Sequence, residues 1–343
     1  MSIQVFCYRL CGCAAAALLA GCSALPFASA QGGLAPDSKP AAKHVRPASC
    51  PPCLYVANQN PARVLVFPVG ATGDTAPLQD ISGSRTDLEN PTAVAIDEKS
   101  NIYVSDFSAN AILEFAAGST GNVKPKATIA GELTRLAQPA GNALDENDNI
   151  YVSNSGGKGS VEVFAAGSKG NVAPMTTISG GKTDLTMAAA GLALDSEDNI
   201  YVALSQNYVV KFSAGSHGDV APTAAIHGKQ TLLSRPTAVT LDGNANIYVA
   251  SFWSHVTVYS AGSNGNVAPV VTIGGSNTRL SGLYGVALDG AGNIYASSQP
   301  ASSRVGRPGI YEFSNGSNGN VNPTGILSGK KALLTYPSGI AIR

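Results

Sequence analysis

The chain has 343 residues, of which 44% are hydrophobic and 13% are charged, with 38 Gly and 20 Pro. Such a hydrophobic share excludes a disordered chain, which combines low hydrophobicity with high net charge, and the abundance of glycine excludes a helical bundle. The 22 basic residues balance the 22 acidic ones, so no overall charge attracts nucleic acid, and we expect no nucleic-acid partner. The composition predicts a turn-rich, all-β protein.

The first 22 residues are typical of a signal peptide. Their apolar run, residues 10–19, is too short to span a bilayer. It ends in Leu-Ala-Gly-Cys, which resembles the lipobox of bacterial lipoproteins. The resemblance implies lipidation of Cys22 and, because Ser23 follows it, a lipid anchor in the outer membrane as the protein's sole membrane contact. The alternative is ordinary cleavage after Ala30, which would leave a periplasmic or secreted protein.

Residues 23–50 carry no hydrophobic periodicity, and their Gly, Ala and Pro content predicts a flexible tether. A folded domain is expected over residues 51–343. At its entrance lies Cys50-Pro-Pro-Cys53. No helix start is available there to lower a thiol pKa. We therefore expect a structural disulfide between Cys50 and Cys53, as suits an oxidising compartment, rather than a redox centre.

From residue 54 onward the chain repeats itself six times. An aromatic residue closes one apolar run of each unit, and the spacings between successive copies are 48, 49, 48, 47 and 54 residues. A proline follows ten residues after each aromatic. The six aromatics are Phe67, Phe115, Phe164, Phe212, Tyr259 and Phe313. Repeats with a period in the forties are typical of propeller blades.

Each unit contains four runs rich in β-branched and aromatic residues, separated by turn residues. In the second unit these runs are residues 93–97, 101–105, 111–115 and 126–130. The N-terminal unit lacks the first run, and the C-terminal residues 337–343 supply it. We therefore predict a monomeric, six-bladed β-propeller with four antiparallel strands per blade. Pairing of the C-terminal strand with the N-terminal strands closes the ring, which removes open sheet edges.

Residues 91–115, which read PTAVAIDEKSNIYVSDFSANAILEF, resemble an NHL repeat. NHL proteins are six-bladed propellers, and the resemblance covers about residues 54–343. It leaves function open, because such propellers include protein and RNA binders, sensors, lactonases and lyases. The chain departs from the family by an Ala-Gly-Ser-x-Gly-Asn-Val insert that recurs along the repeats.

An enzyme is the alternative that this resemblance raises. Gluconolactonase-like propellers hold a divalent metal at the channel mouth, and here the corresponding loops offer Asp106, Asn58 and Asn154 as candidate ligands for Ca²⁺ or Mg²⁺. One carboxylate is few for a hard cation, which prefers about six oxygen ligands. We therefore expect no cofactor and no catalytic residues. A metal-dependent lactonase-like or lyase-like hydrolase remains the second hypothesis.

Several Asp-x-Asn-x-Asn-like runs resemble the start of a calcium loop, as at residues 145–149. The glycine and the distant glutamate of such a loop are missing. Asp and Asn at these positions suit hairpin turns. We expect them to be structural.

The blade-to-blade loops carry a basic residue in every blade, on the rim where propellers usually bind ligands. We expect these cations to focus a positive potential at the channel mouth and to favour a protein, glycan or other anionic ligand. An insertion at residues 299–309 adds two more arginines to this rim. The candidate ligand-binding residues are Arg85, Arg135, Lys182, Lys229, Arg279, Arg304, Arg307 and Lys330. The sequence thus favours a non-catalytic binding or scaffold module, tethered to the cell envelope.

Overall fold

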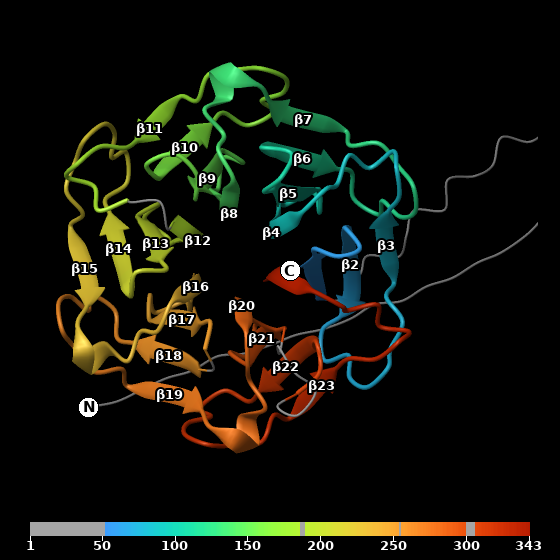
Figure 1. Ribbon diagram of the computed structural model, residues 1–343, viewed down its shortest axis with the longest axis vertical. Coiled ribbons are helices and arrows are strands. Elements are labelled where there is room, and N and C mark those ends of the chain that lie inside the picture. The colour runs from blue at the N-terminus through green and yellow to red at the C-terminus, as the bar shows by residue number, and fades with distance from the viewer. Residues whose placement is uncertain (1–51, 186–188, 254, 300–305) are drawn as a thin grey trace, which may run out of the picture. The chain divides into compact units, whose positions relative to one another are not determined.

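The chain divides into two units, residues 1–45 and 46–343. The computed structural model describes residues 52–185, 189–253, 255–299 and 306–343. The predicted signal peptide, its alternative cleavage point after Ala30, Cys22, the tether and Cys50 therefore lie outside the described residues, as does Arg304. Within the second unit, six four-stranded sheets surround a central channel (Figure 1).

Four strands form each blade, in order from the channel to the outer wall. The first blade contains β24 (Pro337–Ile342), β1 (Cys53–Asn58), β2 (Arg63–Pro68) and β3 (Gln79–Ser82). The second contains β4 (Pro91–Ile96), β5 (Ile102–Asp106), β6 (Ala111–Phe115) and β7 (Ala127–Ala130). The third contains β8 (Pro139–Leu144), β9 (Ile150–Asn154), β10 (Ser160–Phe164) and β11 (Thr176–Ile178).

The remaining three blades follow the same plan. The fourth contains β12 (Ala189–Leu194), β13 (Ile200–Leu204), β14 (Tyr208–Phe212) and β15 (Ala224–His227). The fifth contains β16 (Pro236–Leu241), β17 (Ile247–Ser251), β18 (His255–Tyr259) and β19 (Val271–Gly274). The sixth contains β20 (Leu283–Leu288), β21 (Ile294–Ser298), β22 (Gly309–Phe313) and β23 (Gly325–Leu327). Short 3-10 helices follow three outer strands: η1 (Glu132–Thr134), η2 (Lys229–Thr231) and η3 (Ser276–Thr278).

Ring closure occurs as predicted. The C-terminal strand β24 pairs with β1 in antiparallel register, with Leu54 opposite Ile342 and Val56 opposite Ile340. The backbone N–H of Arg343 donates to the carbonyl oxygen of Cys53 at 3.0 Å, which extends the pairing by one residue. Strands from the two ends of the propeller thus share one sheet (Figure 1), and each sheet is all-antiparallel.

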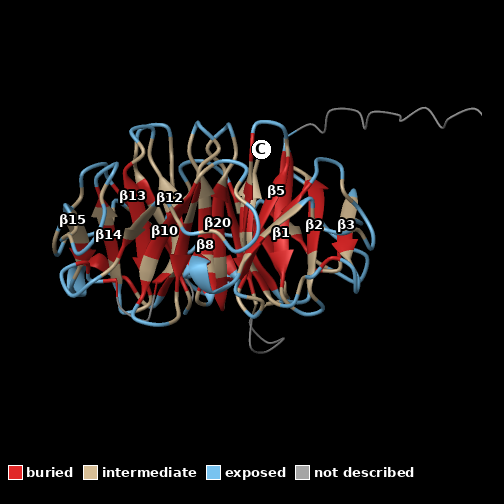
Figure 2. Cartoon of the chain, turned by 90° about the horizontal axis from the view of Figure 1, so that it is seen from above, coloured by how far each residue is buried: buried red, intermediate tan, exposed pale blue. Residues whose placement is uncertain are grey.

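The hydrophobic core lies between neighbouring blades. One cluster joins Tyr55 and Val66 of the first blade to Ile102 and Phe115 of the second. The six repeated aromatics that close the third strand of each blade are all 0% exposed. Burial of each such side chain contributes about 1.5–3 kcal/mol. Buried residues fill the strands, whereas the exposed ones gather in the loops of both rims (Figure 2).

The recurrent insert covers the outer edge of each sheet. In the second blade, the N–H of Gly121 donates to the carbonyl of Asp80 at 2.6 Å, so the insert extends the edge of β3 in the preceding blade. The Oδ1 atom of Asn122 then accepts the N–H of Arg85 at 2.7 Å. A side chain on Gly83 would collide with Asn122 at 2.7 Å. An edge strand with unpaired N–H and C=O groups invites aggregation, and the insert satisfies those groups.

All six blades repeat this latch between an insert Asn or Asp and the following loop of the preceding blade. The acceptor residues are Asp74, Asn122, Asn171, Asp219, Asn266 and Asn320.

Candidate functional site

The six innermost strands line the channel and approach one another closely. A Cβ atom on Gly141 would lie 2.7 Å from the carbonyl oxygen of Ala190 in the next blade, so only glycine fits there. Side-chain hydroxyls join other pairs of inner strands: Thr92 donates to the carbonyl of Pro139 at 2.9 Å, and Ser338 to that of Pro91 at 2.9 Å. The close packing of the inner strands therefore explains why small residues occur where these strands begin.

A cavity of about 270 Å³ opens where the channel reaches the rim of the blade-to-blade loops. We call it the mouth cavity. Among the described residues, its lining contains no Asp, Glu, His, Cys or Lys. The lining residues are Gln59, Asn90, Thr92, Phe107, Ala140, Ser155, Ala189, Ala190, Ser205, Arg235, Pro236, Thr237, Tyr284 and Ser338.

The wall of the mouth cavity differs from blade to blade. The third and fourth blades contribute small residues, among them Ala140 and Ala190. Aromatic rings enter from other blades, Phe107 after β5 and Tyr284 at the start of β20. The cavity is thus bulky on one side and open on the other, although the strands around it are arranged with near six-fold symmetry.

An aromatic cluster extends from the cavity along this rim. The ring of Phe252 packs edge-on against Tyr284, with centroids 5.5 Å apart, and edge-on against Trp253 at 5.0 Å. The guanidinium of Arg235 lies 4.5 Å from the centroid of Phe252, a cation–π arrangement. Trp253 is 61% exposed. A large aromatic surface therefore faces solvent beside the cavity.

Arg235 is held in a strained conformation. Its φ is 57°, a left-handed value that favours glycine, and Gly282 holds the equivalent position in the next blade with φ 62°. The Oδ1 atom of Asn207 accepts the N–H of Arg235 at 2.7 Å and fixes the turn. Among the described residues, the Arg235 side chain forms no ion pair. The Arg235 guanidinium thus lies at the cavity without an ion pair to any described carboxylate.

Four polar side chains at the mouth cavity make no hydrogen bond within the described part of the chain: Gln59, Asn90, Ser155 and Ser205. They are half-buried and supply amide and hydroxyl groups. Polar groups of this kind fix the orientation of a ligand in an otherwise apolar pocket.

Six of the predicted cations lie elsewhere. They follow the outermost strands of the blades, and none of these six lines the mouth cavity. The Nη1 atom of Arg135 donates at 3.4 Å to the hydroxyl of Thr177 on the outer strand β11. The positions expected at the channel mouth are instead peripheral and exposed. These residues are Arg85, Arg135, Lys182, Lys229, Arg279 and Lys330.

Arg307 belongs to the same rim but not to the cavity lining. Its N–H donates to the Tyr311 hydroxyl at 3.1 Å, and that hydroxyl donates to the Arg307 carbonyl at 2.8 Å. These bonds fix the Arg307 backbone beside β22, whereas its side chain is exposed. Among the described residues, the cation that lines the mouth is Arg235. The pattern of the loops does not indicate it, because it precedes an inner strand instead of following an outer one.

The candidate metal ligands have structural partners. Asp106 is fully buried, and its carboxylate accepts the backbone N–H groups of Glu89, Asn90 and Ala109 at 2.8–3.0 Å. Asn58 accepts the N–H groups of Thr335 and Tyr336.

Asn154 completes this set. It accepts from Ala137 and donates to the carbonyl of Arg135, both at 3.0 Å. The three side chains hold incoming loops against the ends of second strands. Among the described residues, no group of three or more His, Cys, Asp or Glu is placed to hold a metal ion.

The opposite rim is built from acidic turns, one after the inner strand of five blades. In the fourth blade, Asp195 accepts the N–H groups of Glu197 and Asn199, together with the Asn199 amide and the Tyr201 hydroxyl. Burial opposes ionisation of Asp195, but the hydrogen bonds from Asn199 and Glu197, together with the nearby Lys211 ammonium, outweigh it and lower the pKa of Asp195 below 3.8. Burial, with Asp145 and other acidic neighbours, raises the pKa of Asp198.

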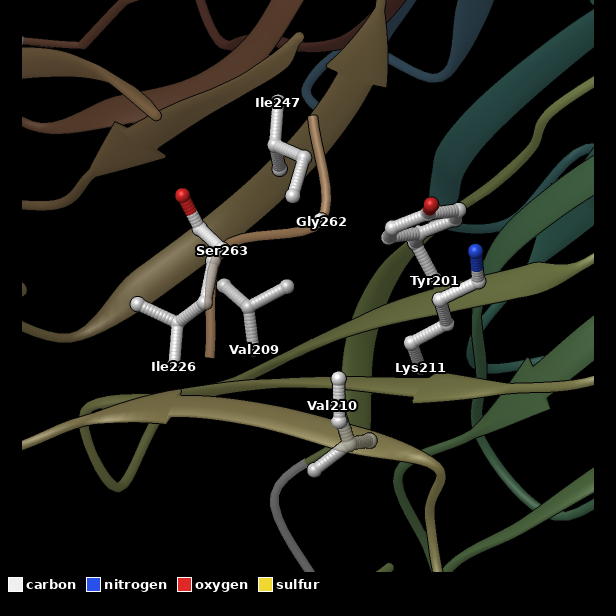
Figure 3. Close-up of a pocket in the computed structure, with 9 residues that line it drawn as sticks. Tyr201, Val209, Val210, Lys211, Ile226, Ile247, Gly262 and Ser263 are labelled. Atoms are coloured by element: carbon white, nitrogen blue, oxygen red, sulfur yellow. The ribbon is translucent and has the colours of Figure 1, made fainter. Parts of the chain in front are cut away.

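Below this rim, a cavity of about 20 Å³ lies between the fourth and fifth blades (Figure 3). The Lys211 ammonium lies 5.0 Å from the ring centroid of Tyr201 and 3.4 Å from Asp195. Burial lowers the pKa of Lys211, but Tyr201 and Asp195 together raise it overall. The space is little larger than one water molecule needs. We therefore regard it as an internal packing feature.

Two further observations bear on the sequence predictions. Cys53 is fully buried and disulfide-bonded, and its expected partner Cys50 lies outside the described residues. Within the parts of the chain that the structure describes, no helix has the length and hydrophobicity to cross a bilayer.

Six antiparallel four-stranded sheets around a channel define a six-bladed β-propeller. A crystal structure of a protein of unknown function from Bacteroides caccae is similar, with a TM-score of 0.63 and 12% sequence identity, covering 85% of this chain and 98% of that one. At this identity the likeness shows the fold alone. No family model matches the chain, and no curated protein matches it.

Proposed function

We propose that the protein is a non-catalytic binding module of the cell envelope and that its ligand occupies the mouth cavity. One observation carries this proposal. Within the described residues, the cavity lining combines aromatic rings, a cation that forms no ion pair and four polar side chains that make no hydrogen bond, and it contains no carboxylate, imidazole or thiol. Acid–base and nucleophilic catalysis usually depend on such groups. Binding depends on apolar contact with a few orienting polar groups.

The cellular setting is part of the same proposal. The NHL-like repeats, the lipobox-like segment ending at Cys22 and the tether support an envelope-anchored propeller, with the periplasmic or secreted form as alternative. Its ligand would be a glycan, a protein or another anionic partner. A propeller held by a flexible tether presents one rim freely to ligands beyond the membrane surface.

A blocked mouth tests the proposal. Ser155→Tyr narrows the cavity from a loop, and Ser84→Tyr adds the same group to an exposed loop at the perimeter of the rim. The intact protein is screened against immobilised glycans and small anions. Ligands that bind the parent and Ser84→Tyr but not Ser155→Tyr would support the proposal. Equal binding by both variants, or no binding to any of these compounds, would contradict it.

The metal-dependent hydrolase makes a different prediction. A Ca²⁺ or Mg²⁺ ion bound by the folded state alone would raise the thermal midpoint. Because Asp106, Asn58 and Asn154 are engaged in hydrogen bonds to loops, we expect the midpoint to stay within about 1 °C at millimolar metal. An increase of several degrees would favour the hydrolase.

A further inference from the structure

Within the proposed binding function, on which this inference rests, we infer that the ligand is a saccharide bearing a carboxylate. The mouth cavity would hold an acidic sugar unit, and Trp253 would stack on the next unit of the same chain.

The charge of the site points to a monoanionic group. Arg235 is the single charged residue among the described residues that line the cavity. A planar guanidinium matches a carboxylate through two parallel N–H donors. A phosphate dianion would call for a second cation, and the described lining offers none beside Arg235.

The aromatic surfaces point to a ring with an apolar face. Pyranose rings present C–H groups on their faces, and these carry a partial positive charge that suits the negative face of an aromatic ring. Tyr284 borders the cavity, Phe252 packs behind it, and Trp253 follows outside. This order from the cavity outward fits a ligand of at least two linked units.

The unused polar groups point to several hydroxyls. The side chains of Gln59, Asn90, Ser155 and Ser205 line the cavity from the first four blades, whereas the aromatic cluster comes from the fifth and sixth. An apolar ligand would leave these amides and hydroxyls desolvated and unpaired, which costs free energy. A sugar satisfies them with its own hydroxyls.

The strained backbone of Arg235 provides a clean variant. Arg235→Gly removes the cation and introduces the residue that already occupies the equivalent position at Gly282. The variant therefore relieves the strain at φ 57° and should fold. Arg85→Gly, an exposed change on the same rim outside the cavity, is the matched control for charge.

Trp253 is also a direct reporter, because it is the single tryptophan of the chain and is 61% exposed. The intact protein is titrated with tetragalacturonate, with its methyl ester and with a neutral galactose tetrasaccharide. We expect the acid to shift the tryptophan emission to shorter wavelength. The ester and the neutral sugar should bind about 10- to 100-fold more weakly, as expected for loss of a charge-assisted hydrogen bond.

In Arg235→Gly the preference for the acid should fall to within about twofold, and Arg85→Gly should retain it. By calorimetry, Trp253→Ala should weaken binding of the acid about tenfold, comparable to losing one stacked ring. Equal affinity for acid and ester, or acid binding that Arg235→Gly leaves unchanged, would overturn the inference. If another class of ligand binds and Ser155→Tyr blocks it, the binding function stands and the acidic saccharide is refuted.

Discussion

The two rims of the propeller use polar residues in opposite ways. On the rim of acidic turns, an Asp follows the inner strand in five blades, and each carboxylate accepts the same backbone N–H groups. At the mouth cavity, the residue after the second strand changes from Gln59 to Phe107 to Ser155, and these side chains have no such partners. Repetition in this chain thus marks structural roles, whereas variation marks the surface available for a ligand.

The contrast holds even between adjacent positions. Asp106 ends β5, and its carboxylate accepts hydrogen bonds from three backbone N–H groups. The next residue, Phe107, faces the mouth cavity. Rim position alone therefore does not predict function; the partners of each side chain do.

The largest expected effect concerns ring closure, on which both rims depend. Deletion of residues 337–343 removes β24 and leaves β1 with an unpaired edge. We expect a loss of more than about 5 kcal/mol from the free energy of unfolding, spread over the whole ring because the core lies between blades. Thermal melting measures it. A matched deletion of residues 36–42, in the predicted tether, should leave the midpoint unchanged. Equal midpoints for both deletions would contradict the closure.

An intermediate effect is expected at the acidic turns. Asp195→Ala removes bonds to Glu197, Asn199 and Tyr201, and should cost roughly 1–3 kcal/mol at pH 7. Since the folded-state pKa of Asp195 lies below 3.8, its ionised form stabilises the protein above that pH. This stabilisation is lost as the pH falls through the folded-state pKa. Urea unfolding of parent and variant at pH 7 and pH 2.5 checks both parts. If the difference in unfolding free energy between parent and variant is the same at both pH values, the charge of Asp195 has no stabilising role.

The smallest effect is expected at the mouth cavity. The side chains of Gln59 and Ser205 make no hydrogen bond within the described part of the chain. Gln59→Ala and Ser205→Ala should therefore each change the free energy of unfolding by less than about 0.5 kcal/mol. The same urea experiment provides the measurement. A loss of more than about 1 kcal/mol of unfolding free energy at either position would show that the polar side chains of the mouth are structural, like those of the acidic rim.

The sequence predicts the architecture well because its markers repeat. For the second blade, the predicted runs 93–97, 101–105, 111–115 and 126–130 agree with β4 to β7 within two residues at each end. Two markers per blade, the aromatic residue and the proline ten residues later, keep the register, and the incomplete first unit requires closure by the C-terminus.

The binding surface could not be predicted in the same way, because it is defined by departures from the repeat. The sequence pattern predicts Arg135 and its counterparts at the mouth because they occupy the blade-to-blade loops, which belong to that rim. Those loops, however, run the full radius of a blade, and the cations lie at their outer ends. Arg235 lies at the inner end of such a loop. One signal is present in the sequence: Phe252 and Trp253 stand together in a short turn, where the second blade carries a single aromatic residue, Phe107, and the third and fourth blades carry Ser155 and Ser205.

The insert that covers each outer edge has a consequence for how such a ring could arise by gene duplication. Every unit carries both halves of a joint: a projecting segment such as Gly121-Asn122, and an edge such as β3 that receives it. Copies of one unit would therefore fit one another head to tail, and such heterologous contacts form a closed ring when the rotation per unit divides the circle. A short chain of one or two blades could thus assemble into a complete propeller before fusion made it a single polypeptide.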